Sequence, residues 1–140
     1  MNKFDSLDLA DVQAAGEIGR RIDLTLNEFV LNVDVDKVFL DPIRRKEDLG
    51  FEKMASGGYL GLGKFIDAAI HFAKYNGDSR VIALKTHLID EVLRAQLADG
   101  YLGVMQPSSR LKCYWDLHEM VYLIHALVND YRLFGLHTSL

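Results

Sequence analysis

Residues 62–93 read LGKFIDAAIHFAKYNGDSRVIALKTHLIDEVL, and this stretch decides the fold. Apolar residues recur every three or four positions on both sides of its centre, which predicts helices over about 59–75 and 79–96. Asn76-Gly77-Asp78 separates them, because Gly77 suits the left-handed position after a helix and Asp78 or Ser79 can cap the next one. With so short a connection, the two helices are expected to form an antiparallel αα-hairpin.

Helical periodicity also extends outward from the hairpin, over about 12–32 and 115–134. Residues 33–57 are expected to be an irregular connection, because Pro42 lacks an amide donor and restricts the residue before it. A second loop starts at Asp99 and includes Pro107. No alternating stretch of useful length predicts a strand, apart from a short one near 32–38. The predicted fold class is therefore all-α.

The two outer helices each carry an apolar side that is expected to be buried. Asp116 is a candidate cap for the later helix. The residues expected to be buried are Ile18, Ile22, Leu26, Phe29 and Val30 in the first helix and Leu117, Met120, Val121, Ile124, Leu127, Val128 and Tyr131 in the last. An Ile124→Asp substitution is accordingly expected to unfold the chain, because it would bury an unpaired charge. The glycine-rich run 58–63 indicates close helix packing or a cap.

Composition excludes several classes of protein. The chain has 140 residues, 49% hydrophobic and 26% charged, which suits one folded domain. With 16 Lys+Arg against 20 Asp+Glu, the net charge of -4 does not favour a nucleic-acid partner. No apolar run is long enough for a membrane span, and no signal peptide is visible. The single cysteine, Cys113, excludes an internal disulfide, which favours a reducing compartment, so the predicted location is cytoplasmic. Its thiol is expected to be inert.

Candidate binding residues gather in residues 114–125, YWDLHEMVYLIH. On a helix, His118, Tyr122 and His125 follow one side, beside the apolar stripe. Imidazole and phenol groups can hydrogen-bond to a polar, uncharged ligand, and the flat rings of Trp115 and Tyr101 suit the apolar face of a sugar. The sequence therefore predicts a carbohydrate-binding wall made by His118, His125, Tyr101, Trp115 and Tyr122.

The histidines of this helix have two other interpretations. Histidines on one helix are often ordinary structural residues with satisfied hydrogen bonds, and spacing alone favours that reading. A zinc protease motif is excluded, because it needs histidines at i and i+4. His118 and His125 are seven residues apart, about 10.5 Å along a helix, which is too far for one ion.

Several short runs together resemble a known family. They are GEIGRRI (16–22) with Asp34-Val35-Asp36, GYLGLGKFIDAA (58–69), DGYLG (99–103) and WDLHE (115–119) followed by His125. In this order and spacing the chain resembles the N-terminal part of the β-L-arabinofuranosidase-like glycoside hydrolases, glycoside hydrolase family 127. The resemblance covers about residues 16–135.

The resemblance implies an (α/α)6 barrel of six helical hairpins around a sugar-binding centre. It also implies retaining hydrolysis of arabinofuranoside-type bonds, with a cysteine nucleophile held at a zinc site and a glutamate acid/base. The histidine of the His-Glu motif, here His118, is implied to bind the sugar. The zinc-binding and acid/base segments of the family lie farther downstream and match nothing in these 140 residues. Cys113 is outside them, so no catalytic residue, metal ligand or cofactor is assigned here.

Length gives an independent expectation. Twelve helices of about 12 residues with eleven loops of about 5 need roughly 200 residues. The chain is therefore expected to be a single helical segment, residues 1–140, from the N-terminal portion of a larger catalytic barrel, as a truncated gene product or one piece of a longer one. Uncovered apolar faces are expected to favour self-association. The alternative is a non-catalytic all-α module that binds a sugar or another protein.

Overall fold

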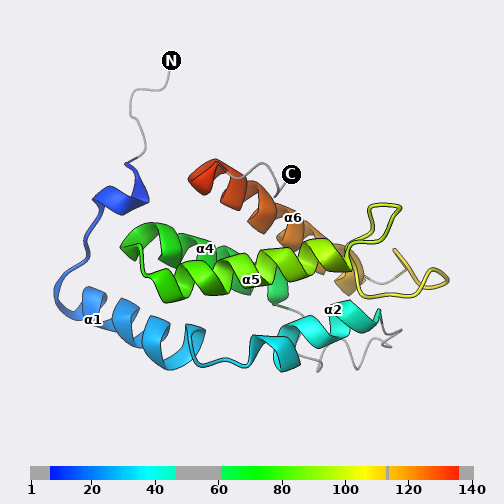
Figure 1. Cartoon of the computed structure of the whole chain (residues 1–140), viewed down its shortest axis with the longest axis horizontal. Coiled ribbons are helices and arrows are strands. Elements are labelled where there is room, and N and C mark those ends of the chain that lie inside the picture. The colour runs from blue at the N-terminus through cyan, green and yellow to red at the C-terminus, as the bar shows by residue number, and fades with distance from the viewer. Residues whose placement is uncertain (1–6, 47–60, 113, 136–140) are drawn as a thin grey trace, which may run out of the picture.

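The structure is a computed structural model that describes residues 7–46, 61–112 and 114–135 (Figure 1). Every regular element in these ranges is helical, so the predicted all-α class is confirmed. The elements are η1 (Leu9–Asp11), α1 (Gly16–Thr25), η2 (Leu26–Val30), η3 (Asp36–Leu40), α2 (Asp41–Arg45), α4 (Leu62–Asn76), α5 (Ser79–Ala95) and α6 (Tyr114–Phe134). Among these described helices, none has the length and apolar character that crossing a membrane requires.

The hairpin predicted from residues 62–93 is confirmed as α4 and α5, which lie side by side in Figure 1. Gly77 ends α4 at a φ of 65°, and its amide donates to the Ala73 carbonyl at 3.0 Å. Asp78 caps α5, because its side chain accepts a hydrogen bond from the amide of Arg80 at 2.9 Å. The local stop and start signals in the sequence therefore set both helix ends.

The core lies between α4, α5 and α6, with α4 at the centre. Ile66, Ala69 and Ile70 of α4 are fully buried, as are Leu88 and Val92 of α5. These residues fall on the apolar sides predicted for the two helices. In Figure 1, α6 lies on one side of the hairpin, and the row from α1 to α2 lies on the other.

The irregular connection predicted for residues 33–57 is wrong in its first part. Residues 36–45 form η3 and α2, which pack against α5 with Leu40 and Ile43 buried. Pro42 stands in the first turn of α2, where a helix does not need the amide hydrogen that proline lacks. Arg44 fastens this segment to α5 by pairing with Asp36 and Glu91, each at 2.6 Å. Residues 47–57 lie outside the described ranges.

The first helix is also less buried than its pattern predicts. Leu26 and Val30 of η2 are buried, but Ile18 is 69% exposed and Phe29 is 56% exposed. No residue of α1 is buried among the described residues, because no other described helix covers it. The backbone approaches closely at Gly19, where a Cβ atom would lie 2.5 Å from the Ala14 carbonyl oxygen.

The largest correction concerns α6. Its outer side carries four apolar residues predicted to be buried, and they are 37–62% exposed: Leu117, Val121, Ile124 and Val128. Its inner side, against α4, buries Leu123, Ala126 and Leu127 together with three acidic residues, Asp116, Glu119 and Asp130. The expectation that Ile124→Asp unfolds the chain is therefore wrong for a side chain that is 54% exposed.

Each buried acid of α6 has a partner on another segment, which offsets the cost of removing a carboxylate from water. Asp116 accepts from the Tyr101 hydroxyl at 2.8 Å, so it joins α6 to the preceding loop and is not the N-terminal cap that the sequence suggested. Asp130 pairs with Lys85 of α5 at 2.6 Å. These long-range pairs fix the rotation of α6 about its axis.

Close packing lets Glu119 reach α4. A Cβ atom on Gly63 would lie 2.4 Å from the backbone carbon of Tyr122, so the α4 and α6 backbones meet at a position that only glycine allows. The close helix packing predicted from the glycine-rich run is confirmed here. Gly58 to Leu60, the first part of that run, lie outside the described residues.

Candidate functional site

An aromatic cluster occupies the first half of α6, around His118. The ring centre of His118 lies 4.8 Å from that of Tyr122, 5.4 Å from Trp115 and 5.9 Å from Tyr114. Spacings of three and four residues on one helix bring these side chains together. Lys64 of α4 adds a cation 4.4 Å from the centre of the Tyr122 ring.

A surface hollow of about 330 Å³ lies beside this cluster. Its lining residues are Tyr114, Leu117, His118, Val121 and Tyr122. The Nδ1 atom of His118 is buried and has no hydrogen-bond partner among the described residues. A buried polar atom without a partner is uncommon in folded proteins, and a bound polar group is one way to satisfy it. The hollow thus combines flat rings, an imidazole and a phenol, the groups that suit a polar, uncharged ligand.

The structure brings three of the five predicted binding residues together: His118, Trp115 and Tyr122. His125 lies elsewhere on α6, with its Nε2 atom 3.0 Å from the Asn129 side-chain nitrogen. Asn129 in turn donates to Asp67 of α4 at 2.7 Å. His125 therefore belongs to a second polar cluster between α4 and α6 and does not line the hollow.

Tyr101 is also outside the hollow, and its hydroxyl group already has partners. It donates to Asp116 at 2.8 Å and accepts from the Met105 amide at 2.9 Å. The Arg110 guanidinium lies 4.2 Å from the centre of its ring. Burial raises the pKa of Tyr101, so the hydroxyl stays protonated and holds the loop against α6. Its place in this structure is that of a support for the loop.

Lys46 reaches the same loop from the end of α2. Its ammonium group donates to the Gly103 carbonyl at 2.8 Å. Burial, together with the charge of the neighbouring Arg110, lowers the pKa of Lys46 to about 8, although Asp116 acts in the opposite direction. The Lys46 side chain thus connects the end of α2 to the loop.

Sequence reasoning missed Lys64 and the role of Glu119, because both depend on the contact between α4 and α6. Tyr114 belongs to the candidate stretch 114–125, and the structure places it in the wall of the hollow. Glu119 is 4% exposed and accepts a hydrogen bond from the Gly63 amide at 2.8 Å. It thereby provides the cap that Gly61, which has no side chain, cannot give to α4. The glutamate of the His-Glu run points away from the hollow, into the joint between α4 and α6.

The pH dependence of stability offers a test of the contact between Glu119 of α6 and the N-terminus of α4. Burial raises the pKa of Glu119 from its ordinary value near 4.5 to about 7, although the amides of Gly63, Gly61 and Leu62 and the charge of Lys64 act in the opposite direction. A raised pKa in the folded state favours folding at low pH, and this contribution is lost as pH rises through about 7. Relative to Glu119→Gln, the wild type should therefore lose on the order of 3 kcal/mol of unfolding free energy between pH 4.5 and pH 8.

Urea unfolding of both chains at several pH values measures this difference, and all other titrating groups cancel because both chains share them. Parallel pH profiles for the two chains would show that Glu119 titrates normally and is not buried in the joint.

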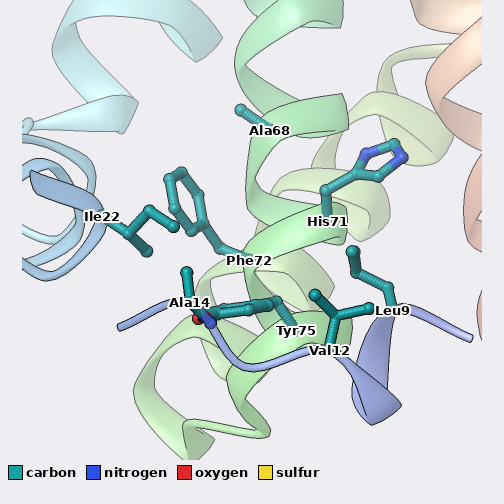
Figure 2. A pocket seen from close by; sticks show the side chains of 8 residues that line it. All are labelled: Leu9, Val12, Ala14, Ile22, Ala68, His71, Phe72 and Tyr75. Atoms are coloured by element: carbon teal, nitrogen blue, oxygen red, sulfur yellow. Dashed lines mark hydrogen bonds between the residues drawn. The ribbon is translucent and has the colours of Figure 1, made fainter. Parts of the chain in front are cut away.

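A second pocket of about 330 Å³ lies between α4 and the N-terminal segment (Figure 2). Ala14 in this segment donates to the Tyr75 hydroxyl at 2.9 Å, and Asp8 pairs with Lys74 at 3.0 Å. The pocket is lined by Leu9, Val12, Ala14, Ile22, Ala68, His71, Phe72 and Tyr75. None of the predicted binding residues takes part in this second pocket.

The described residues do not fit the zinc that the family resemblance implies. Within residues 7–46, 61–112 and 114–135, no three His, Cys, Asp or Glu side chains come close enough together to hold a metal ion. Cys113 lies outside these ranges. No chemical step through zinc is therefore derived for this chain.

Comparisons with known proteins do not identify the chain: no family model, no curated protein and no solved structure matches it.

Proposed function

We propose that the protein binds carbohydrate through the hollow on α6, with His118 and Tyr122 as the binding residues that line it and Trp115 packed against the His118 ring. The observation that carries this proposal is the buried, unpartnered Nδ1 atom of His118 within a cluster of aromatic rings. A sugar hydroxyl can donate to or accept from an imidazole nitrogen, while its C–H face packs on an aromatic ring. Tyr114, 70% exposed at the edge of the hollow, adds a further ring surface.

The proposed context of this wall is a glycoside hydrolase of the arabinofuranosidase-like type. The sequence runs that resemble that family support it, as does the all-helical fold. In this proposal the chain forms part of an (α/α)6 barrel, and His118 positions the sugar while residues outside this chain perform retaining hydrolysis. A cytoplasmic location belongs to the same proposal and rests on the single cysteine.

A second candidate function is a non-catalytic all-α sugar-binding module. One observation favours it: among the described residues no acidic side chain lines the hollow, and Glu119 is turned toward the N-terminus of α4. Glycoside hydrolysis normally needs two carboxyl groups beside the scissile bond or another nucleophile in place of one of them. Both candidates share the binding step, so one experiment tests that step for both.

The experiment is an NMR titration with L-arabinose, other pentoses and hexoses. Saturable shifts of the His118 and Trp115 resonances at millimolar sugar are the expected result. His118→Ala should weaken binding about five- to tenfold, because it removes one hydrogen bond to a polar ligand, and helix content by circular dichroism should stay unchanged. His125→Ala is the matched control, since His125 lies outside the hollow.

Unmoved His118 and Trp115 resonances, or equal weakening by the two alanine variants, would contradict the proposed binding site. A loss of folding in His118→Ala would instead assign His118 a structural role.

A further inference from the structure

We infer that the outer side of α6 is a self-association surface that pairs with α6 of a second copy of this chain. The surface consists of Tyr114, Leu117, Val121, Ile124 and Val128, named here the α6 seam. These five side chains are 70%, 44%, 62%, 54% and 37% exposed. The inference does not depend on the proposed sugar binding.

The spacing of the α6 seam identifies a helix as its partner. The five residues follow one another at intervals of three, four, three and four, which is the a/d pattern of a two-helix coiled coil. Valine at the a positions 121 and 128, with leucine at the d position 117, is the combination that favours pairs over larger assemblies in parallel coiled coils. The seam itself contains no charged residue, so nothing in it opposes burial against an identical seam.

The shape of the surface agrees with this pairing. In coiled coils each side chain inserts into a hole made by four residues of the facing helix, at i, i+3, i+4 and i+7. Tyr114, Leu117, His118 and Val121 stand at this spacing and line the hollow already described. The first hole of a coiled-coil seam is therefore already formed in the single chain.

A second copy suits the seam as its occupant because an a/d seam is complementary to an identical seam. In a parallel, in-register pair each seam residue faces its own counterpart, so Val121 packs against Val121 and Ile124 against Ile124. Closed two-fold pairs are the commonest form of self-association.

The exposed area sets the strength of the pair. If a large side chain exposes about 150 Å² when fully accessible, the seam would bury on the order of 400 Å² in each copy. Stable complexes of standard size bury about 800 Å² in each partner. The pair should therefore be weak and concentration-dependent, with a dissociation constant on the order of 10–100 µM.

Sedimentation velocity from about 5 to about 500 µM tests the inference, because mass action shifts a weak pair across this range. The wild type should change from monomer to dimer. Ile124→Glu, in the seam but outside the hollow, should stay monomeric at the highest concentration, at least a tenfold loss of affinity. Ile18→Glu is the matched control, because Ile18 is 69% exposed on α1, and it should dimerise like the wild type.

A crosslink locates the contact. With Cys113→Ser in the background, Val121→Cys should form a disulfide-linked dimer on mild oxidation, and Ile18→Cys should not. A wild type that remains monomeric at the highest concentration overturns the inference. So does a dimer that Ile124→Glu leaves intact or that Ile18→Glu disrupts equally.

The same variants keep this inference separate from the sugar proposal. Ile124→Glu leaves every residue of the hollow in place, so it should still show sugar-induced shifts at His118 even though it no longer dimerises. Loss of the dimer with retained sugar binding thus assigns the seam to self-association alone. In the wild type, sugar and the second copy share the hollow, so saturating sugar should move the equilibrium toward monomer.

Discussion

Replacing Lys85 by methionine is expected to lower the free energy of unfolding by about 3–5 kcal/mol, because it leaves the carboxylate of Asp130 buried without its cation. Lys85 is 2% exposed and Asp130 is 0% exposed, and their charged atoms lie 2.6 Å apart. The ammonium group also lies 4.3 Å from the centre of the Phe134 ring. This pair joins α5 to the C-terminal half of α6. A loss of this size is a large part of the 5–15 kcal/mol that typically stabilises a domain.

Urea unfolding measures the effect, and a second substitution shows its origin. Lys85→Met with Asp130→Leu should recover most of the loss, because the double variant removes both charges of this pair. Arg21→Met is the exposed control. Its partner Glu17 is more than half exposed, and such surface pairs contribute about 0–1 kcal/mol. A loss below about 1 kcal/mol for Lys85→Met would mean that water reaches Asp130 in solution.

The hairpin could be predicted from the sequence because its signals are local. Gly77 and Asp78 act on the backbone within a few residues, and the apolar residues of α4 and α5 repeat without interruption. Local reasoning failed at Pro42, where the same proline is compatible with a helix start or a helix end. The first-turn position is decided by the burial of Leu40 and Ile43 against α5, which pattern alone does not reveal.

The rotation of α6 could not be predicted, because the partners that decide it are far away in the sequence. Asp130 pairs with Lys85, which lies 45 residues earlier in the sequence, and Glu119 accepts a hydrogen bond from the Gly63 amide, 56 residues earlier. Burying an acid without a partner is costly. A prediction from the hydrophobic pattern alone therefore places the acidic side of α6 toward solvent. With these partners, the acidic side turns inward and the apolar side remains exposed.

The sequence predicted only those parts of the candidate site that depend on local spacing. His118 and Tyr122 are four residues apart, and a helix brings them together wherever its faces point. His125 shares their side of the helix but lies two turns away from His118 and pairs with Asn129. The position of Tyr101 depends on the fold of a long loop, and its contact with Asp116 has no local signal.

The second large prediction compares two neighbouring residues of α6. Leu123 is 0% exposed and Ile124 is 54% exposed. Leu123→Asp is expected to unfold the chain, because it puts an unpaired carboxylate into the core at a cost above about 4 kcal/mol. Ile124→Asp should change the unfolding free energy by about 0.5–1 kcal/mol at most, since its carboxylate reaches water. The two variants carry the same new charge on the same helix at adjacent positions, so the main difference is the direction of the side chain.

Both the proposed sugar site in the hollow and the α6 seam require that α6 turns Asp116, Glu119 and Asp130 toward the rest of the fold and its apolar side outward. Thermal unfolding of the Leu123→Asp and Ile124→Asp chains, followed by circular dichroism, tests this orientation most directly. A cooperative transition near that of the wild type for Ile124→Asp, with none for Leu123→Asp, is the result expected here. A folded Leu123→Asp chain beside an unfolded Ile124→Asp chain would contradict it.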